Sequence, residues 1–187
     1  MEAQILRLNI AGQPVEWVHW QTAVTLYVRD VVAWSLGDTV RRVRGGVNRA
    51  SGQQTVIALP SIIASNGERL ARPRTTYPLN NKTLFARDGH LCMYCGGPFA
   101  ESELTRDHIL PLSRGGTDIW ENVVASCRRC NQHKGNRLLA DTALELLATP
   151  YRPNLAEYLA LLNDRRIRAD QMEFLRSQFS KNYRALN

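Results

Sequence analysis

Two closely spaced cysteine pairs constrain the fold of this chain more than any other feature of its sequence. The pairs read Cys92-Met-Tyr-Cys95 and Cys127-Arg-Arg-Cys130, and the chain has no other cysteine. Each pair offers two thiolates from one tight turn, and four thiolates complete the tetrahedral coordination that zinc prefers. Because a zinc ion with four protein ligands has no open position for a substrate, the sequence predicts a structural zinc site.

The cysteine pairs have two alternative roles, in redox chemistry and in disulfide bonds. Two C-x-x-C motifs without a thioredoxin-like βαβ pattern argue against redox chemistry. Disulfides are typical of secreted proteins, whereas residues 1–4 lack the basic start and apolar block of a secretory signal. No apolar run is long enough to cross a bilayer. We therefore expect a cytoplasmic protein without a membrane partner, in which the cysteines bind zinc.

Basic residues concentrate upstream of the cysteines. The formal net charge is +7, and residues 36–80 contain two acidic residues against seven arginines: Arg41, Arg42, Arg44, Arg49, Arg69, Arg72 and Arg74. Such a segment suits a polyanion such as nucleic acid, because each arginine can displace a counterion condensed on phosphate. A solvated arginine-rich hairpin explains the same pattern equally well. Charge alone leaves both interpretations open.

A small ββα unit is predicted between and after the cysteine pairs. Residues 104–110 have strand character, Pro111 ends the strand, and Gly115-Gly116 indicate a turn. Residues 122–126 are β-branched enough for a second strand, and a helix is expected from Cys130 through residues 131–139. This order predicts two antiparallel strands and a helix that zinc holds together.

The ordered set of residues in this region resembles the HNH nuclease family, whose fold is called ββα-metal. The resemblance spans residues 84–137 and keeps both residue types and spacing. It rests on Cys92, Cys95, Asp107-His108-Ile109, Pro111, Gly115-Gly116, Asn122, Cys127, Cys130, Asn131 and Lys134. Residues 5–9, 20–26 and 84–92, with Pro14, also resemble the leader of a bacterial and phage subgroup of HNH proteins.

The resemblance assigns roles in phosphodiester hydrolysis to four residues. It implies that His108 is the general base, that Asp107 and Asn131 hold a catalytic Mg²⁺ or Mn²⁺, and that Asn122 fixes the loop that orients the base. The residue types suit these roles, since imidazole titrates near working pH and oxygen ligands suit these ions. Asn131 stands where many family members carry histidine, so the chain is an H-N-N variant. The resemblance also implies products with a 5′-phosphate and a 3′-hydroxyl.

Plainer interpretations of the same residues stay open. Asp107 can simply pair with Arg106, and His108 can be a core histidine with satisfied hydrogen bonds. Basic residues of the unit are expected to contact the DNA backbone, or otherwise to be solvated: Lys134, Arg114, Arg128, Arg129 and Arg137.

The predicted fold class is α+β, with a ββα-metal core and structural zinc knuckles, a β-rich region before it and helices after it. We predict three regions: residues 1–80 with a basic arm, the HNH domain at residues 81–140, and a helical region at residues 141–187. Strands are expected at residues 4–10 and 55–63, and helices at residues 141–148, 155–162 and 170–183. The last helix is amphipathic and is expected to pack on the nuclease core or to mediate a dimer.

The predicted function is a metal-dependent HNH endonuclease that hydrolyses DNA phosphodiester bonds, by nicking double-stranded DNA. Single-stranded DNA is a further candidate substrate. The alternative is a non-catalytic zinc-ribbon module that binds nucleic acid, which explains the cysteines and the charge but not Asp107, His108, Asn122 and Asn131. We expect a monomer, or a homodimer formed through the C-terminal helix, in a bacterial cell or a phage-infected host.

Overall fold

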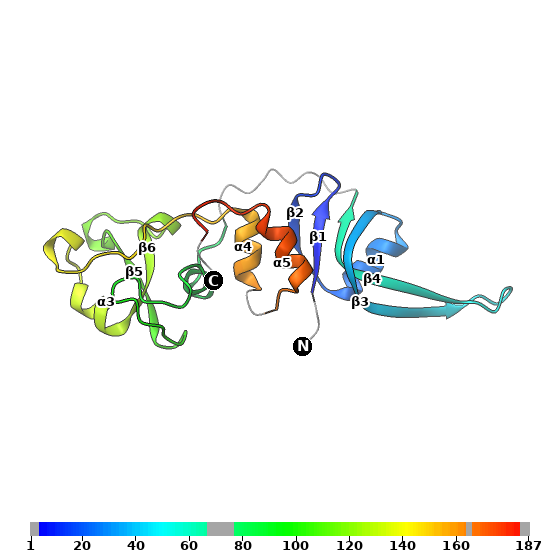
Figure 1. The fold of residues 1–187 in the computed structure, drawn as a ribbon, viewed down its shortest axis with the longest axis horizontal. Coiled ribbons are helices and arrows are strands. Elements are labelled where there is room, and N and C mark those ends of the chain that lie inside the picture. Colours follow the sequence, from blue (N-terminus) through cyan, green and yellow to red (C-terminus); the bar gives the residue numbers. More distant parts are fainter. Residues whose placement is uncertain (1–3, 67–76, 164–165, 184–187) are drawn as a thin grey trace. The chain divides into compact units, whose positions relative to one another are not determined.

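The computed structural model describes residues 4–66, 77–163 and 166–183, and the chain divides into two compact units. Residues 1–75 and 165–178 form unit 1, and residues 76–164 and 179–187 form unit 2 (Figure 1). The C-terminal segment from residue 141 onward is therefore shared between the two units. None of the helices in the described segments is long and apolar enough to cross a membrane.

Unit 1 is built on a mixed four-stranded sheet. Its elements are β1 Ile5–Asn9, β2 Pro14–Val18, α1 Trp20–Val28, β3 Val32–Val47, β4 Gln54–Ser65 and α5 Ala169–Arg176. The strand order is β2-β1-β4-β3, with β1 and β4 parallel and the other neighbours antiparallel. Apolar side chains of β1, β2 and β4 pack with Ala23 of α1 in one cluster. The strands predicted near residues 4–10 and 55–63 are confirmed.

Helix α5 packs on β3 and β4 of unit 1, where a polar contact holds it. The Asp170 carboxylate accepts a hydrogen bond from Ser61 Oγ at 2.5 Å. Gly37 has φ +83°, and a Cβ atom added there would lie 2.0 Å from Ser61 Oγ, so this position requires glycine.

The C-terminal helix is shorter than the sequence pattern predicts. It ends at Arg176 instead of continuing to residue 183. The sequence predicts that the whole helix packs on the nuclease core or mediates a dimer, whereas α5 belongs to unit 1. Only the segment after α5 packs in unit 2, where Tyr183 lies against Ala86 and Leu161.

Unit 2 contains the predicted ββα arrangement. Its elements are α2 Asn81–Arg87, β5 Leu104–His108, β6 Val123–Cys127, α3 Arg128–Lys134 and α4 Leu155–Leu162, with 3-10 turns at Leu112–Arg114, Trp120–Asn122 and Leu139–Asp141. Strands β5 and β6 are antiparallel, with Asp107 opposite Val124. Helix α3 begins two residues before Cys130 and stops at Lys134, where Gly135 has φ +55°. The ββα order is confirmed, although the helix is shorter than predicted.

The helix predicted for residues 141–148 is wrong. After the turn at Leu139–Asp141 the chain is irregular, and alternate side chains at Leu144, Leu146 and Ala148 pack against the cysteine-containing cluster. Burial of every second residue requires an extended backbone rather than a helix. The backbone N–H of Leu147 donates to the carbonyl of Met93, which ties this segment to the first cysteine pair. The helix predicted at residues 155–162 is confirmed as α4.

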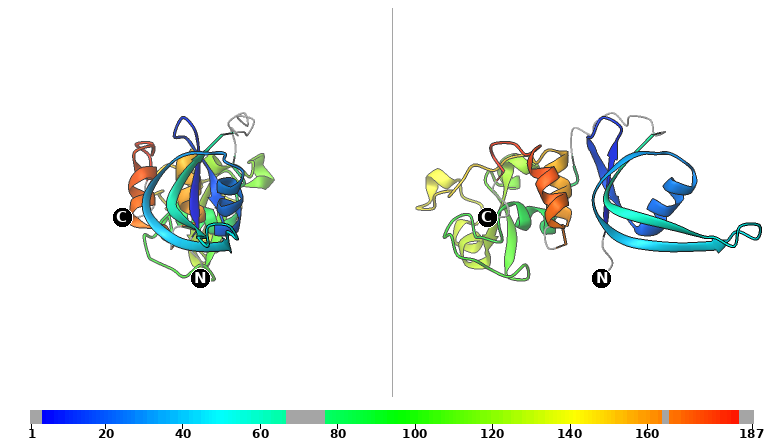
Figure 2. Two further views of the ribbon diagram at one scale, coloured as in Figure 1. Left: turned by 90° about the vertical axis from the view of Figure 1, so that its right-hand side faces the viewer. Right: turned by 45° about the vertical axis from the view of Figure 1, so that its right-hand side comes forward.

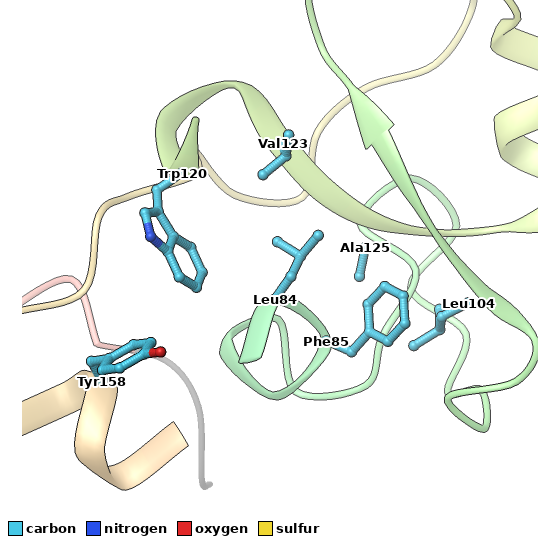
Figure 3. Close-up of a cluster of buried hydrophobic side chains, with 7 residues drawn as sticks. All are labelled: Leu84, Phe85, Leu104, Trp120, Val123, Ala125 and Tyr158. Carbon is cyan, nitrogen blue, oxygen red and sulfur yellow. The ribbon is translucent and has the colours of Figure 1, made fainter. Parts of the chain in front are cut away.

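The hydrophobic core of unit 2 lies between α2, the β5–β6 pair and α4. Figure 3 shows its seven buried side chains: Leu84, Phe85, Leu104, Trp120, Val123, Ala125 and Tyr158. Helix α2 was not predicted, yet it provides two of them. Its start is set by Asn80, whose side chain accepts a hydrogen bond from Thr83 N at 3.0 Å.

A buried ion pair at the end of α2 holds strand β6 against this core. The guanidinium group of Arg87 is fully buried and forms a two-point contact with Asp88, with distances of 2.9 and 3.0 Å. It also donates to the backbone carbonyls of Trp120, Val123 and Tyr151. A buried charge requires such a complete set of partners. Arg87 therefore determines where β6 and the segment before α4 meet.

Replacement of Arg87 should destabilise unit 2 strongly. We predict that Arg87→Met lowers the free energy of unfolding of this unit by about 3–5 kcal/mol, because it leaves Asp88 as an uncompensated buried charge. Hydrogen exchange of the β6 amides measures this loss. The control is Arg152→Gln, which removes an exposed ion pair with Glu121 and should cost at most about 1 kcal/mol. Equal protection of the β6 amides from hydrogen exchange in the two variants would contradict this role of Arg87.

Candidate active site and zinc centre

The four cysteines converge on one point of unit 2. Their Sγ atoms all lie within 4.8 Å of one another. Cys92 and Cys95 lie on the turn before β5, Cys127 ends β6, and Cys130 lies in α3. Three of them are buried and Cys95 is exposed. This set of four clustered sulfur donors fits a structural zinc ion, whose four coordination positions would all be filled by the protein.

The surroundings of Cys92 favour a thiolate. Burial acts to raise its pKa, but hydrogen bonds from the backbone N–H groups of Cys127, Cys95 and Tyr94 outweigh burial and lower the pKa to about 6. A thiolate is the form that binds metal. Burial instead raises the pKa of Cys130, so the fit of the four cysteines to zinc rests on their sulfur donors and their spacing.

Asp107 is buried in β5 and has two side-chain partners. One carboxylate oxygen accepts a hydrogen bond from the Tyr94 hydroxyl, and the other lies 3.2 Å from Lys134 Nζ. Burial and the hydrogen bond to Asp107 both raise the pKa of Tyr94, so this hydroxyl stays a donor. The sequence analysis did not identify Tyr94, because a tyrosine inside a cysteine pair gives no signal of its orientation.

Lys134 occupies the interior rather than the surface. Its side chain is fully buried at the end of α3, and Nζ also donates to the backbone carbonyl of His108 at 2.6 Å. A phosphate contact was predicted for this lysine, on the expectation that it lies near the helix start. The structure instead gives its ammonium group two internal partners, Asp107 and His108, and leaves it no exposed surface for DNA.

His108 ends β5 and is paired with a carboxylate that the sequence analysis missed. His108 Nε2 lies 2.9 Å from Asp118 Oδ1, and Arg106 Nη1 lies 2.6 Å from Asp118 Oδ2. Partial burial acts to raise the pKa of Asp118, but the hydrogen bonds from Arg106 and His108 outweigh it and lower the pKa. The Gly-Gly-Thr-Asp loop contains no periodic pattern that would place Asp118 beside His108. Only the closure of that loop brings them together.

Asn122 closes the loop between β5 and β6. Its amide group accepts from Leu110 N and donates to the carbonyls of Leu110 and Thr117, at 2.8–3.0 Å. A Cβ atom added to Gly116 would lie 1.9 Å from the Leu110 carbonyl oxygen, so the loop can close this tightly only around glycine. These contacts fix the path of the chain between His108 and Asp118.

Asn131 of α3 faces β5. Its Nδ2 donates to Thr105 Oγ1 at 2.8 Å, and it lies 3.5 Å from the carbonyl oxygen of Arg106. With the amide nitrogen used in this way, the amide oxygen is the atom that can serve as a ligand. These contacts hold Asn131 against Thr105 and Arg106 of β5, the strand that also contains Asp107 and His108.

The four arginines predicted to contact DNA are all exposed, and three of them also have contacts within the protein. Arg114 lies 3.8 Å from Asp141, and Arg128 donates to the Ser102 carbonyl at 3.0 Å. Arg137 donates to backbone carbonyls of His133 and Lys134 at the end of α3. Arg128 and Arg129 line a hollow beside the cysteines. Their exposure leaves these side chains accessible to a polyanion.

Comparison with known proteins agrees with this geometry. A family model described as HNH endonuclease matches residues 92–146. This segment is therefore similar to an HNH endonuclease domain. CRISPR-associated endonuclease Cas9 of Corynebacterium diphtheriae is 52% identical over 46 residues, which are 24% of this chain and 4% of Cas9. The resemblance predicted from the motif is confirmed for the HNH domain, while the chain spans only a small fraction of the length of this relative.

Removal of zinc should unfold unit 2 while unit 1 keeps its structure. We predict that the purified protein contains about one zinc ion per chain and that Cys127→Ser loses it, because oxygen replaces one of four thiolates. Metal analysis gives the zinc content, and hydrogen exchange compares the β6 amides with those of β1. The control is Ser102→Ala, at an exposed position outside the cysteine cluster. A metal-free protein that keeps full protection of β6 would contradict the structural role.

Proposed function

We propose that the protein is a metal-dependent endonuclease that hydrolyses DNA phosphodiester bonds and nicks double-stranded DNA. One observation supports the proposal: within the segment that matches the HNH endonuclease family, β5 contains Asp107 and His108, and the neighbouring helix α3 contacts this strand through Asn131 and Lys134. Such a group contains a proton acceptor and two oxygen ligands, which phosphodiester hydrolysis with an activated water requires.

In the proposed mechanism, His108 removes a proton from the attacking water. The Asp118 carboxylate contacts Nε2, so the neutral imidazole carries its hydrogen on that nitrogen and keeps Nδ1 as the proton acceptor. Asp118 also binds Arg106, whose Nε donates to Asn81 Oδ1 at 3.0 Å. This chain of contacts holds the ring in one orientation, while Asn122 holds the loop that presents Asp118.

Asp107 and Asn131 are the residues that would hold the catalytic ion. A bound Mg²⁺ or Mn²⁺ would stabilise negative charge on the phosphate and on the leaving oxygen. Each carboxylate oxygen of Asp107 has a second lone pair besides the one that faces Tyr94 or Lys134. Lys134 holds this carboxylate in place and balances its charge, since a buried carboxylate without a partner would be unstable.

A second function, nucleic-acid binding without cleavage, is favoured by the exposed arginines beside the zinc centre. Arg128 and Arg129 can contact phosphates whether or not hydrolysis follows. In that case the contacts of His108 and Asn131 would be structural only. The two functions differ in one property, because a binding module needs neither a second divalent ion nor His108 for its activity.

Loss of the His108 imidazole should abolish cleavage without unfolding the protein. We predict that His108→Ala reduces the rate of supercoiled-plasmid nicking in Mg²⁺ or Mn²⁺ by about 100-fold or more, as expected for loss of a general base. The matched control is His133→Ala, which removes an exposed histidine of α3. Zinc content and β6 protection should be unchanged in both. Nicking by the His108 variant at the wild-type rate, or no nicking by any form despite tight DNA binding, would refute the proposal.

Asp118 should act through His108 rather than through DNA binding. We predict that Asp118→Asn lowers kcat by about 10–100-fold with little change in KM, the usual effect of losing a carboxylate that orients a functional histidine. In imidazole ¹⁵N spectra, His108 should be the Nε2–H tautomer in the wild type and a mixture in the variant. Asp141→Asn, which removes an exposed carboxylate near Arg114, serves as the control. Equal kcat and equal tautomer populations in the two variants would contradict this role.

A further inference from the structure

The long hairpin of β3 and β4 extends beyond the sheet of unit 1 as a two-stranded ribbon (Figures 1 and 2). The two strands pair from Val32↔Ser65 out to Val47↔Gln54, whereas β1 pairs with β4 only at Leu6↔Ile62 through Asn9↔Ser65. The outer part of the hairpin, residues 39–60, therefore has no neighbouring strand in the described structure. We call residues 39–60 the arm.

The arm is ordered to its tip. The Asn48 side chain accepts from the backbone N–H groups of Ala50 and Ser51, and its own backbone bonds to Gln53 and Gly52 at 2.8 Å. Every residue from 44 to 56 is exposed. Leu59 at the base of the arm belongs to the core cluster of unit 1, and Val43 and Ile57 pack against it. The exposed outer ribbon, residues 44–56, lies beyond these residues and is suited to contact another molecule.

All charged side chains of the arm are positive. Residues 39–66 contain four arginines and no acidic residue or lysine. Arg41 stacks on the Trp20 ring at 4.1 Å, which anchors the base of the arm to α1. The other three, Arg42, Arg44 and Arg49, are exposed and make no ion pair with the residues that the structure describes. Three unpaired guanidinium groups on one ribbon favour a polyanionic partner.

We infer that the arm is a second DNA-binding element, which enters a groove of duplex DNA and contacts its phosphates through Arg42, Arg44 and Arg49. Two strands about 4.8 Å apart fit a major groove about 12 Å wide, which admits a β-ribbon. Gly45 and Gly46 keep the middle of the ribbon slim, and nothing lies within 4 Å of a Cβ atom added to Gly46. The inference deepens the proposed function, since it rests on DNA as the substrate.

A second copy of this chain is the competing occupant of the arm. The free edge of β4 offers backbone groups to another strand, and exposed edges readily pair in this way. Exposed Val47 and Val56 would also suit such a contact. Charge favours DNA over a second arm, because pairing two arms would bring like-charged arginines together.

The test measures DNA binding by the full chain with Arg42, Arg44 and Arg49 replaced by glutamine. All forms carry His108→Ala, so that the DNA remains intact, and binding to a 30-base-pair duplex and to a single strand of equal length is followed by fluorescence anisotropy at several salt concentrations. The matched control removes the same charge from three exposed arginines of unit 1 outside the arm: Arg29, Arg166 and Arg176.

The arm variant should bind the duplex at least about tenfold more weakly than the control at about 0.1 M salt. The slope of log Kd against log salt concentration should fall by about 3, since each phosphate contact contributes about 0.9. Preference for duplex over single strand should fall as well. Equal affinities and slopes in the arm variant and the control would overturn the inference. So would a wild-type dimer that the arm variant converts to monomers without loss of DNA affinity per chain.

Failure of the arm can be distinguished from failure of the nuclease. Plasmid nicking by the chain with intact His108 tests the nuclease alone. If nicking depends on His108 while the arm substitutions leave binding unchanged, the arm inference fails and the nuclease stands. If the arm substitutions weaken duplex binding but no nicking occurs in any metal, the arm stands and the nuclease fails.

Discussion

The buried ammonium group of Lys134 is the constraint on which the arrangement of the candidate active site depends. It lies at the end of α3 and binds the Asp107 carboxylate and the His108 carbonyl of β5. The start of the same helix contains Cys127 and Cys130, two of the four clustered thiols that could bind zinc. Helix α3 is therefore fixed at both ends, and Asn131 between them is presented to β5 in one position. A seven-residue helix could not hold this position alone.

In unit 2, the residues that stabilise the fold differ from those proposed to carry out hydrolysis. The four cysteines suit a closed zinc site that adds stability to a domain with a small core. Arg87 and Asp88 also bind backbone groups of β6, at the Val123 carbonyl and the Ala125 N–H. The strand is therefore held by these contacts as well as by Cys127 at its end. His108, the proposed general base, lies outside both anchors, at the end of β5. This separation explains why loss of His108 and loss of a cysteine should have different consequences.

Sequence reasoning succeeded where residue type and spacing alone determine the structure. The cysteine pairs, the two strands around the Gly-Gly turn and the order of the ββα unit required only local patterns. It failed where long-range packing decides. The pattern of residues 141–148 predicts a helix, yet Leu144, Leu146 and Ala148 pack alternately against the cysteine cluster in an extended segment. Lys134 looked like a surface cation, because no local pattern reveals that a buried carboxylate lies beside it.

Asp118 shows the same limit within the site. Ten residues separate it from His108, and their contact depends on the loop that Asn122 closes. Helix α2 was missed because its seven residues are too few for a clear periodicity, although its Arg87 holds the core together. Such contacts become visible only when the fold is known. These contacts orient residues that the motif had already identified.

The chemical outcome of cleavage in ¹⁸O-labelled water tests the central claim most directly. If His108 activates water for attack on phosphorus, the nicked plasmid carries one ¹⁸O atom in its 5′-phosphate, and DNA ligase reseals the nick through the adjacent 3′-hydroxyl. We predict this product from the wild-type chain and none from His108→Ala. Nicks that end in a 3′-phosphate, or labelled 5′-phosphate formed equally well by the His108 variant, would contradict it.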